Sequence, residues 1–380
     1  MTAGKSMENR ITQEEIRLAN RQQIYRFIYD NGKASSPDIC AALSLSRPTV
    51  ASNLAGMEAE GLIRKDGLQD AGQVGRRAVV YAISATYRIA IGVEVLRTRA
   101  NIIAVDLYGK QLGVVKARIP YANEPSYYEA LCEQIRSFIR SMHFKQEQVL
   151  GICITMQGLV SPDWTTIVYG EILGNTGLKI DVFADRLPYP CAFVHDPAAA
   201  ALSELQIAPE IDSVQYVSLS SHLGGATIVN RRIQSGKHGH HATFEHIRAT
   251  RKGEPCYCGQ IGCWDTLCSM PTLLGDEEPE DFFEQMRAGD KARCKSWRTF
   301  LKHLARLIKD LHLVNDIDIM LGGRLAPFMI PEDIDLLYKK IREICPFEEE
   351  DDFILLSKMP AYHIPTGAAL HYIHKFLENV

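Results

Sequence analysis

The pattern of apolar positions predicts three short helices in the first sixty residues. The first carries an apolar face spaced at i, i+3 and i+4, formed by Ile24, Phe27 and Ile28, and it ends at Asn31-Gly32. The second begins near Ser36-Pro37, because proline fits a first helical turn, and the third begins at Ser46 after the turn "LSLS". We expect these two helices to bury Ile39, Ala42 and Leu43 in the second and Val50, Leu54 and Met57 in the third.

Two β-strands are predicted after the helices, at Leu62–Lys65 and Ala78–Ile83. The loop between them contains three glycines and ends in Arg76-Arg77. Three helices followed by such a hairpin are typical of a winged helix-turn-helix, which we assign to residues 1–86.

The outward face of the third predicted helix is polar and basic. Such groups reach base edges and phosphates from the major groove, and arginines at a wing tip enter the minor groove or contact phosphates. The candidate DNA-binding residues are therefore Ser46, Arg47, Thr49, Ser52, Asn53, Arg76 and Arg77. The alternative is a small helical protein-interaction domain with solvated arginines, but the wing and its Gly-Arg-Arg tip favour DNA.

From Tyr87 onward, strand patterns alternate with helical ones, which predicts an α/β architecture of two lobes with a cleft between them. "IAIGVEVLRTRANIIAVDLYGKQL" reads as a hairpin that turns at Gly109, and "YPCAFVHDPAAAALSEL" reads as a strand, a loop and an alanine-rich helix. The first lobe is assigned to residues 87–197 plus a C-terminal helix, 365–380. The second lobe is assigned to 198–364.

Composition places the chain among ordinary globular proteins, with 46% apolar and 23% charged residues in 380. No apolar run approaches the roughly 18 residues that cross a bilayer, and the start lacks a signal-peptide core, so we expect a cytoplasmic protein without membrane contact. The net charge of −4 divides into +2 for residues 1–86 and −6 for the remainder, which is weak support for nucleic-acid binding at the amino end.

Three of the ten cysteines form a compact motif, Cys256-x-Cys258-x4-Cys263. A tetrahedral zinc site needs a fourth ligand, for which His246 and Cys268 are candidates. A redox role is disfavoured because the motif lacks the Cys-x-x-Cys spacing of thiol oxidoreductases.

Several motifs make the chain resemble the ROK family (repressors, open reading frames, sugar kinases) in its winged-helix transcription-factor branch. They are "GRRAVVYAI", "IGVEV…VDLYG", "MQGLV", "VHDPAAAALSE" and the cysteine signature "CYCGQIGCWDT". The resemblance implies a two-lobed actin/ribonuclease-H-like sugar-kinase fold after the winged helix-turn-helix. It also implies a closed structural Zn²⁺ site with His246, Cys256, Cys258 and Cys263 as ligands, which leaves Cys268 as a buried thiol.

The kinase motifs of this family are altered here. The first phosphate-binding turn corresponds to residues 93–99, where Glu94 replaces an aspartate and Leu96 and Arg97 occupy glycine positions. The second corresponds to residues 220–225, where two glycines remain and His222 would project toward the phosphate. Phosphoryl transfer depends on such positioning, so we expect a protein that is not an enzyme.

Other positions retain part of a sugar pocket. Asp196 matches the kinase aspartate that deprotonates the sugar hydroxyl, although a carboxylate before Pro197 also suits a helix N-cap. The family's Ala-Gly-Glu-x-Gly-His segment falls on residues 241–246, where Thr243 replaces the sugar-binding glutamate, Glu245 replaces the second glycine and His246 is retained. The candidate effector-binding residues are Asp196, Thr243, His246 and Asp265, the last in place of a sugar-contacting glutamate.

The sequence thus predicts a DNA-binding transcriptional regulator, a repressor of carbohydrate-related genes, with a degenerate sugar-kinase sensor domain. Its expected partners are a palindromic double-stranded operator, a sugar-like effector and further copies of itself in a homodimer or homotetramer. Two alternatives stay open: a sugar kinase carrying an extra amino-terminal domain, and a zinc-stabilised interaction module that does not bind DNA.

Overall fold

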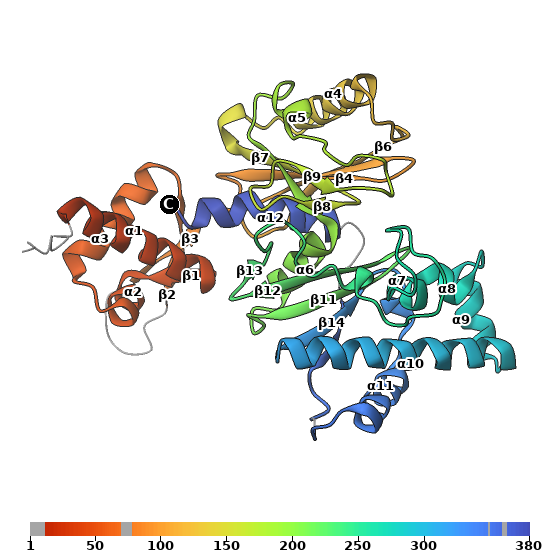
Figure 1. Ribbon diagram of the computed structural model, residues 1–380. Helices are drawn as coiled ribbons and strands as arrows, with labels where there is room; N and C mark the ends of the chain where they lie inside the picture. The colour runs from red at the N-terminus through yellow and green to blue at the C-terminus, as the bar shows by residue number, and fades with distance from the viewer. Residues whose placement is uncertain (1–11, 70–77, 349, 359–362) are drawn as a thin grey trace, which may run out of the picture.

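The computed structural model describes residues 12–69, 78–348, 350–358 and 363–380, which form a small head and a two-lobed body (Figure 1). The head consists of α1 (Gln13–Asp30), β1 (Lys33–Ser35), α2 (Ser36–Leu43), α3 (Arg47–Ala59), β2 (Ile63–Gln69) and β3 (Ala78–Ile83). No helix within these described ranges has the length and apolarity needed to cross a membrane.

The helices of the head begin where side chains can satisfy their first free amides. Thr12 and Glu15 form a capping box at α1, and Ser35 and Asp38 form a second one at α2. Each N-cap of this kind contributes about 0.5–2 kcal/mol to stability. The predicted apolar faces of the three helices meet in one core, with Ile24, Ile28, Ile39, Val50, Leu54 and Met57 all buried.

Two details of the head differ from the sequence prediction. Ala42 is exposed, because α2 turns Ile39 and parts of Cys40 and Leu43 toward the core. The sheet has a third strand, β1, which pairs antiparallel with β3 so that Ser35 lies opposite Val80. Three residues are too few to show the alternation that identifies a strand in sequence.

The first lobe is built on a five-stranded sheet with the order β10-β7-β4-β5-β6, in which β4, β7 and β10 run parallel. Gly109, with φ of +75°, turns the chain between β5 and β6, so the predicted hairpin is part of a three-stranded meander. The elements of this lobe are β4 (Ile89–Val95), β5 (Ala100–Val105), β6 (Gln111–Ala117), α4 (Pro125–Ser141), η1 (Gln146–Gln148), β7 (Val149–Met156), β8 (Leu159–Val160), β9 (Ile167–Tyr169), α5 (Asp181–Ala184) and β10 (Cys191–His195).

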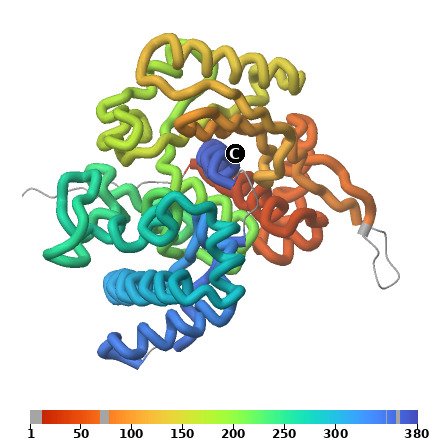
Figure 2. The backbone as a smooth tube through the Cα atoms, turned by 90° about the vertical axis from the view of Figure 1, so that its right-hand side faces the viewer, coloured from red at the N-terminus to blue at the C-terminus, as the bar shows by residue number. Residues whose placement is uncertain are grey.

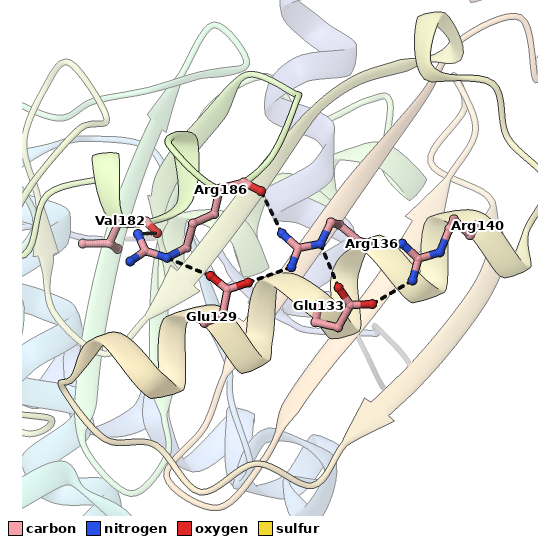
Figure 3. Close-up of polar contacts among 6 residues, drawn as sticks. All are labelled: Glu129, Glu133, Arg136, Arg140, Val182 and Arg186. Atoms are coloured by element: carbon pink, nitrogen blue, oxygen red, sulfur yellow. Dashed lines mark hydrogen bonds and ion pairs between the residues drawn. The ribbon is translucent and has the colours of Figure 1, made fainter.

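Helix α4 covers the outer face of this sheet and carries a row of ion pairs on its solvent side (Figure 3). Arg136 contacts both Glu129 and Glu133, Arg140 contacts Glu133, and Arg186 contacts Glu129 from the segment after α5. The carboxylates are more than half exposed, so each pair contributes about 0–1 kcal/mol. The buried apolar face of α4 therefore fixes its position.

The second lobe repeats the topology of the first, with the sheet order β13-β12-β11-β14-β15 and β11, β14 and β15 parallel. Its elements are β11 (Val214–Leu219), β12 (Leu223–Val229), β13 (Arg232–Ile233), η2 (Phe244–His246), α7 (Asp265–Cys268), α8 (Met270–Leu274), α9 (Pro279–Arg287), α10 (Lys291–Val314), β14 (Asp318–Gly322), η3 (Ala326–Phe328), α11 (Pro331–Ile344) and β15 (Ile354–Leu356). Helices α10 and α11 cover its outer face (Figure 1).

Two helices, α6 (Asp196–Ile207) and α12 (His363–Leu377), pack against each other between the two sheets. They approach closely because small residues meet, and a Cβ atom added to Gly367 would lie 1.7 Å from the carbonyl oxygen of Ala199. In Figures 1 and 2, α12 passes between the lobes and ends beside the head.

The core of the head is continuous with the core formed by α6 and α12. Tyr29 of α1 stacks on Tyr108 with ring centroids 4.6 Å apart and donates its hydroxyl to the Leu107 carbonyl at 2.8 Å. Gln206, in the last turn of α6, donates to the Tyr108 carbonyl at 3.0 Å, and Phe376 of α12 packs edge-on against Tyr25. The head is thereby attached to both interlobe helices.

Candidate functional site

A cleft opens where the carboxyl ends of the parallel strands of both lobes face one another. This is the edge of an open α/β sheet at which ligands bind. Glu94 lies in β4, Thr155 near the end of β7, His195 at the end of β10 and Ser218 near the end of β11. All four line a cavity of about 230 Å³.

Asp196 lies in this cleft as the first residue of α6. The residue at the N-cap position is His195, and its side chain makes no capping bond, so the sequence-based interpretation of Asp196 as the N-cap is corrected. Burial, with a smaller contribution from the nearby Glu94 carboxyl, raises the pKa of Asp196 to about 7. Asp196 thus lines the cavity from the first turn of α6, where its carboxyl also interacts with its own backbone amide.

The short helix η2 brings Glu245 and His246 to the wall of the cleft. Glu245 is only 4% exposed, and its Oε2 atom has no hydrogen-bond partner among the described residues. Burial, followed by the charges of Asp265 and Asp196, raises the pKa of Glu245 to about 8. Glu245 was not among the candidate effector-binding residues, but the sequence had already marked it as a departure from the kinase pattern, at the position of a family glycine.

Thr243 and Asp265, both predicted to bind the effector, do not line the cleft. The Thr243 hydroxyl donates to the His240 carbonyl at 3.0 Å. Asp265 is buried, accepts the Leu223 amide at 2.8 Å and lies 3.4 Å from the His222 ring nitrogen. Asp265 therefore supports the cleft wall from behind.

In both turns that correspond to the kinase phosphate loops, groups are already engaged in hydrogen bonds within this chain. The Leu223 amide, which lies within residues 220–225, already donates to Asp265. Gly225 is needed for packing, because a Cβ atom there would lie 2.3 Å from the Phe244 ring. In the first turn, Glu94 accepts a hydrogen bond from Asn101 at 2.7 Å. An ionised carboxyl at this turn would repel a negatively charged phosphate.

The four candidate metal ligands lie together. The ligand atoms of His246, Cys256, Cys258 and Cys263 are all within 4.8 Å of one another. His246 Nδ1 lies 3.7 Å from Cys256 Sγ, and Cys258 Sγ lies 3.7 Å from Cys263 Sγ. A tetrahedral ion with bonds of about 2.3 Å to sulfur needs ligand atoms about 3.8 Å apart, so this geometry suits zinc.

The local backbone explains how the motif folds into a knuckle. Gly259 and Gly262 have φ of +85° and +75°, which side chains other than glycine rarely adopt. Cys268 is fully buried in the helix α7 and does not belong to the four-residue cluster.

The candidate DNA-binding residues of α3 form the start and the outward side of that helix. Ser46 is the N-cap and accepts the Thr49 amide at 3.3 Å, while the side chains of Arg47 and Ser52 are exposed. Thr49 and Asn53 are half-buried, and the Asn53 amide donates to the Thr49 carbonyl at 2.9 Å. Arg76 and Arg77 lie outside the described residues.

The chain thus combines a winged helical head with a body of the two-lobed α/β type that carries a cleft and a Cys3His cluster. Comparison with protein families identifies the ROK family over residues 90–341 and a winged helix-turn-helix DNA-binding domain over residues 17–64. The chain belongs to the ROK family.

Individual relatives agree with this assignment. The DNA-binding transcriptional dual regulator NagC of Escherichia coli strain K12 is 30% identical over 262 residues, which are 68% of this chain and 64% of NagC, slightly under two thirds of that relative. The xylose repressor of Bacillus subtilis strain 168 is 24% identical over 68% of both chains. A solved ROK family transcriptional regulator, a homologue of the E. coli MLC protein, has the same fold, with a TM-score of 0.78, 20% identity and coverage of 96% of this chain and 97% of its own.

Proposed function

We propose that this protein is a sugar-responsive DNA-binding transcriptional regulator, and specifically a repressor of carbohydrate-related genes. The observation that carries the proposal is the continuous core that joins the head to α6 and α12, the two helices that begin beside the cleft. The names of the relatives support it, since one is a transcriptional regulator and another a xylose repressor.

The head is the DNA-binding part of this proposal. Helix α3 enters the major groove, with Ser46, Arg47, Thr49, Ser52 and Asn53 reaching bases and phosphates, and Arg76 and Arg77 supply the wing contacts. A homodimer or homotetramer presents two heads to a palindromic operator.

The cleft is the sensor. Asp196 accepts hydrogen bonds from ligand hydroxyls, and His246 joins the cleft wall to the metal cluster. Ligand binding alters the closure of the two lobes, and α6 and α12 carry the change to the head. This coupling requires that the ligand bind the two states of the body with different affinity.

The Cys3His cluster holds a structural Zn²⁺ ion. When bound, zinc supplies a cross-link between η2 and the knuckle at residues 256–263. Four protein ligands would close the coordination of a tetrahedral ion, so the site would offer no open position to a substrate. Its effect on the sensor is to fix His246 and the adjacent Glu245 against the cleft.

A gel shift of the upstream region of the protein's own gene, repeated at several salt concentrations, tests the DNA-binding proposal. We expect a specific shift whose affinity falls steeply with salt, because each phosphate contact releases counterions. Arg47→Ala should lower affinity by about tenfold and reduce the salt slope by about one. Arg140→Ala, which changes an exposed arginine of α4 in the body, serves as the matched control. The absence of a gel shift with the wild-type protein would contradict the proposal.

One observation favours a second candidate, a sugar kinase, namely Asp196 in the cleft with a pKa raised to about 7, which suits a general base. We propose instead that the protein is not an enzyme, because the Leu223 amide of the second turn is already bonded to Asp265 and Glu94 adds a carboxyl to the first turn. A coupled ADP-release assay across a sugar panel separates the two, since robust turnover contradicts the regulator-only proposal.

A further inference from the structure

Three of the candidate DNA-binding side chains of α3 are bonded to α3 itself. The Ser46 hydroxyl accepts the Thr49 amide at 3.3 Å and lies 2.8 Å from the Thr49 hydroxyl. Asn53 is half-buried, and its side-chain amide donates to the Thr49 carbonyl at 2.9 Å. The side chains best placed to read bases are therefore those that point outward from the helix.

The outward face of α3 is formed by exposed residues over about its first two and a half turns, and most of them are small and apolar. Arg47, Ala51 and Ala55 follow one another at intervals of four residues, so they lie in one row. Pro48 and Ser52 lie beside this row. The face thus offers DNA one cation, one hydroxyl and a surface of methyl and methylene groups.

The charges along α3 indicate which half of the helix approaches DNA. Arg47 is the first helical residue, at the positive end of the helix dipole. The other end carries Glu58 and the C-cap Glu60, which form ion pairs with Lys65 and Arg21. These pairs leave the last turn without the net positive charge that attracts phosphates. The first half of α3 is therefore the part that enters the groove, as in other helix-turn-helix domains.

Small apolar side chains in the major groove favour one base. Thymine is the base that presents a methyl group there, and alanine contacts this group without removing water from a donor or an acceptor. The match of residues 17–64 to a DNA-binding domain independently places α3 at the nucleic acid. Residues four apart lie about 6 Å apart along a helix, a distance of about two base steps.

On the basis of the proposed DNA-binding role, we infer that Ala51 and Ala55 determine specificity by contacting the methyl groups of two thymines in each operator half-site. The two thymines belong to base pairs about two steps apart. Ser46, Thr49 and Asn53 hold the start of the helix in shape while these two alanines read the sequence.

Selection of random duplexes by the full-length protein, followed by substitution of single bases, tests this inference. In the selected duplex, each thymine of one half-site is replaced in turn by deoxyuridine, which lacks only the methyl group. We expect two of these replacements to weaken binding about three- to fivefold, the effect of one buried methyl group, and the others to change it by less than about 1.5-fold. Fluorescence anisotropy measures each affinity.

Ala51→Gly and Ala55→Gly show which side chain meets which thymine. Each variant should abolish the deoxyuridine effect at one of the two positions and retain it at the other. The readout is the ratio of affinities for the thymine and deoxyuridine duplexes, which a less stable helix does not change by itself. Ala59→Gly is the matched control, because Ala59 is an exposed alanine of the last turn, and both ratios should stay as in the wild type.

The inference is overturned if no thymine shows a methyl effect, or if the effects persist unchanged in both Ala51→Gly and Ala55→Gly. Failure of the proposed function gives a different result, because selection then yields no duplex that is bound more tightly than an unrelated one. That result contradicts the regulator and this inference together. A specific duplex without methyl effects contradicts only the assignment of Ala51 and Ala55.

Discussion

At the scale of single residues, His246 connects two features of the body. Its ring lies 3.7 Å from Cys256 Sγ in the metal cluster, and the residue also lines the cleft. The rings of Tyr169 and Tyr257 pack edge-on against it, with centroids 6.0 and 4.9 Å away. Loss of the metal should therefore disturb the cleft as well as the knuckle.

Cys258→Ser should release about one zinc per chain and lower thermal stability, because three ligands hold zinc much less tightly than four. Elemental analysis of dialysed protein and a melting curve measure both effects. Cys268→Ala is the matched control, because Cys268, like Cys258, is five residues from Cys263 but lies outside the cluster. This variant should retain its full zinc content. Wild-type protein that is fully stable and free of zinc would refute the assignment.

The histidines of α12 predict how stability depends on pH. Burial, together with the charges of Arg231 and Arg26, lowers the pKa of His374 to about 4. Burial and the charge of Lys375 lower the pKa of His371 to about 4 as well. The unfolded chain takes up these protons near pH 6.5, before the folded chain does. The free energy of unfolding should therefore fall as the pH drops from about 6.5 toward 4, and these groups have no effect above that range.

His374→Gln should retain about 2 kcal/mol more stability than the wild type at pH 5, relative to each protein's own value at pH 7.5. Urea denaturation at the two pH values measures the difference. His238→Gln, at an exposed position, is the control. An unchanged acid sensitivity in His374→Gln would show that this side chain is not the source.

At the scale of elements, α6 and α12 approach each other closely at Gly367. Gly367→Ala places a methyl group against the Ala199 carbonyl and the Ser203 hydroxyl. We expect a loss of about 2–3 kcal/mol in the free energy of unfolding, because overpacking forces the helices apart. Denaturant titration checks this value.

Gly56→Ala in α3 is the matched comparison, because no atom lies within 4 Å of the added methyl group. It should stabilise the protein by up to about 1 kcal/mol, the helix-propensity difference between the two residues. Equal effects of the two substitutions would contradict the proposed close packing.

Several elements could be predicted from sequence because local signals specify them. The three helices of the head have apolar faces and capping residues, and the strand before Gly322 has a continuous apolar run. Strand β1 was missed because three residues carry no periodicity, and its pairing with β3 is a contact across the head.

The cleft was less predictable because its residues come from separate strands. The sequence identified Asp196 and His246 and marked both Thr243 and Glu245 as departures from the kinase pattern, and of these two Glu245 lies in the wall. Which of two neighbouring side chains faces a cavity depends on the path of η2, which is set by packing of Phe244 against Gly225.

At the scale of the whole molecule, α6 and α12 begin beside the cleft and end at the head. The contact of Gln206 with the Tyr108 carbonyl, beside the Tyr29 ring, lies at the far end of α6 from Asp196. A change in the angle between the lobes would move these ends relative to each other. Removal of this contact with the head should therefore weaken the effect of the ligand on DNA binding.

Gln206→Ala should leave the affinities for DNA alone and for sugar alone within about threefold, while reducing the effect of saturating sugar on DNA affinity. Fluorescence anisotropy with labelled DNA, with and without sugar, measures this coupling. Gln146→Ala is the control, because its amide also donates to a backbone carbonyl, that of Pro188, but in the first lobe away from the head. A full ligand response in Gln206→Ala would exclude this contact from the coupling.

The most direct test of the central claim is a single anisotropy titration of full-length protein against a labelled duplex from its own upstream region, performed with and without the tightest-binding sugar. The account predicts specific binding with a Kd of about 10⁻⁸ M or tighter near physiological salt, and a change of about fivefold or more when the sugar is present. Binding no tighter than to an unrelated duplex, or an affinity that the sugar leaves unchanged, would contradict it.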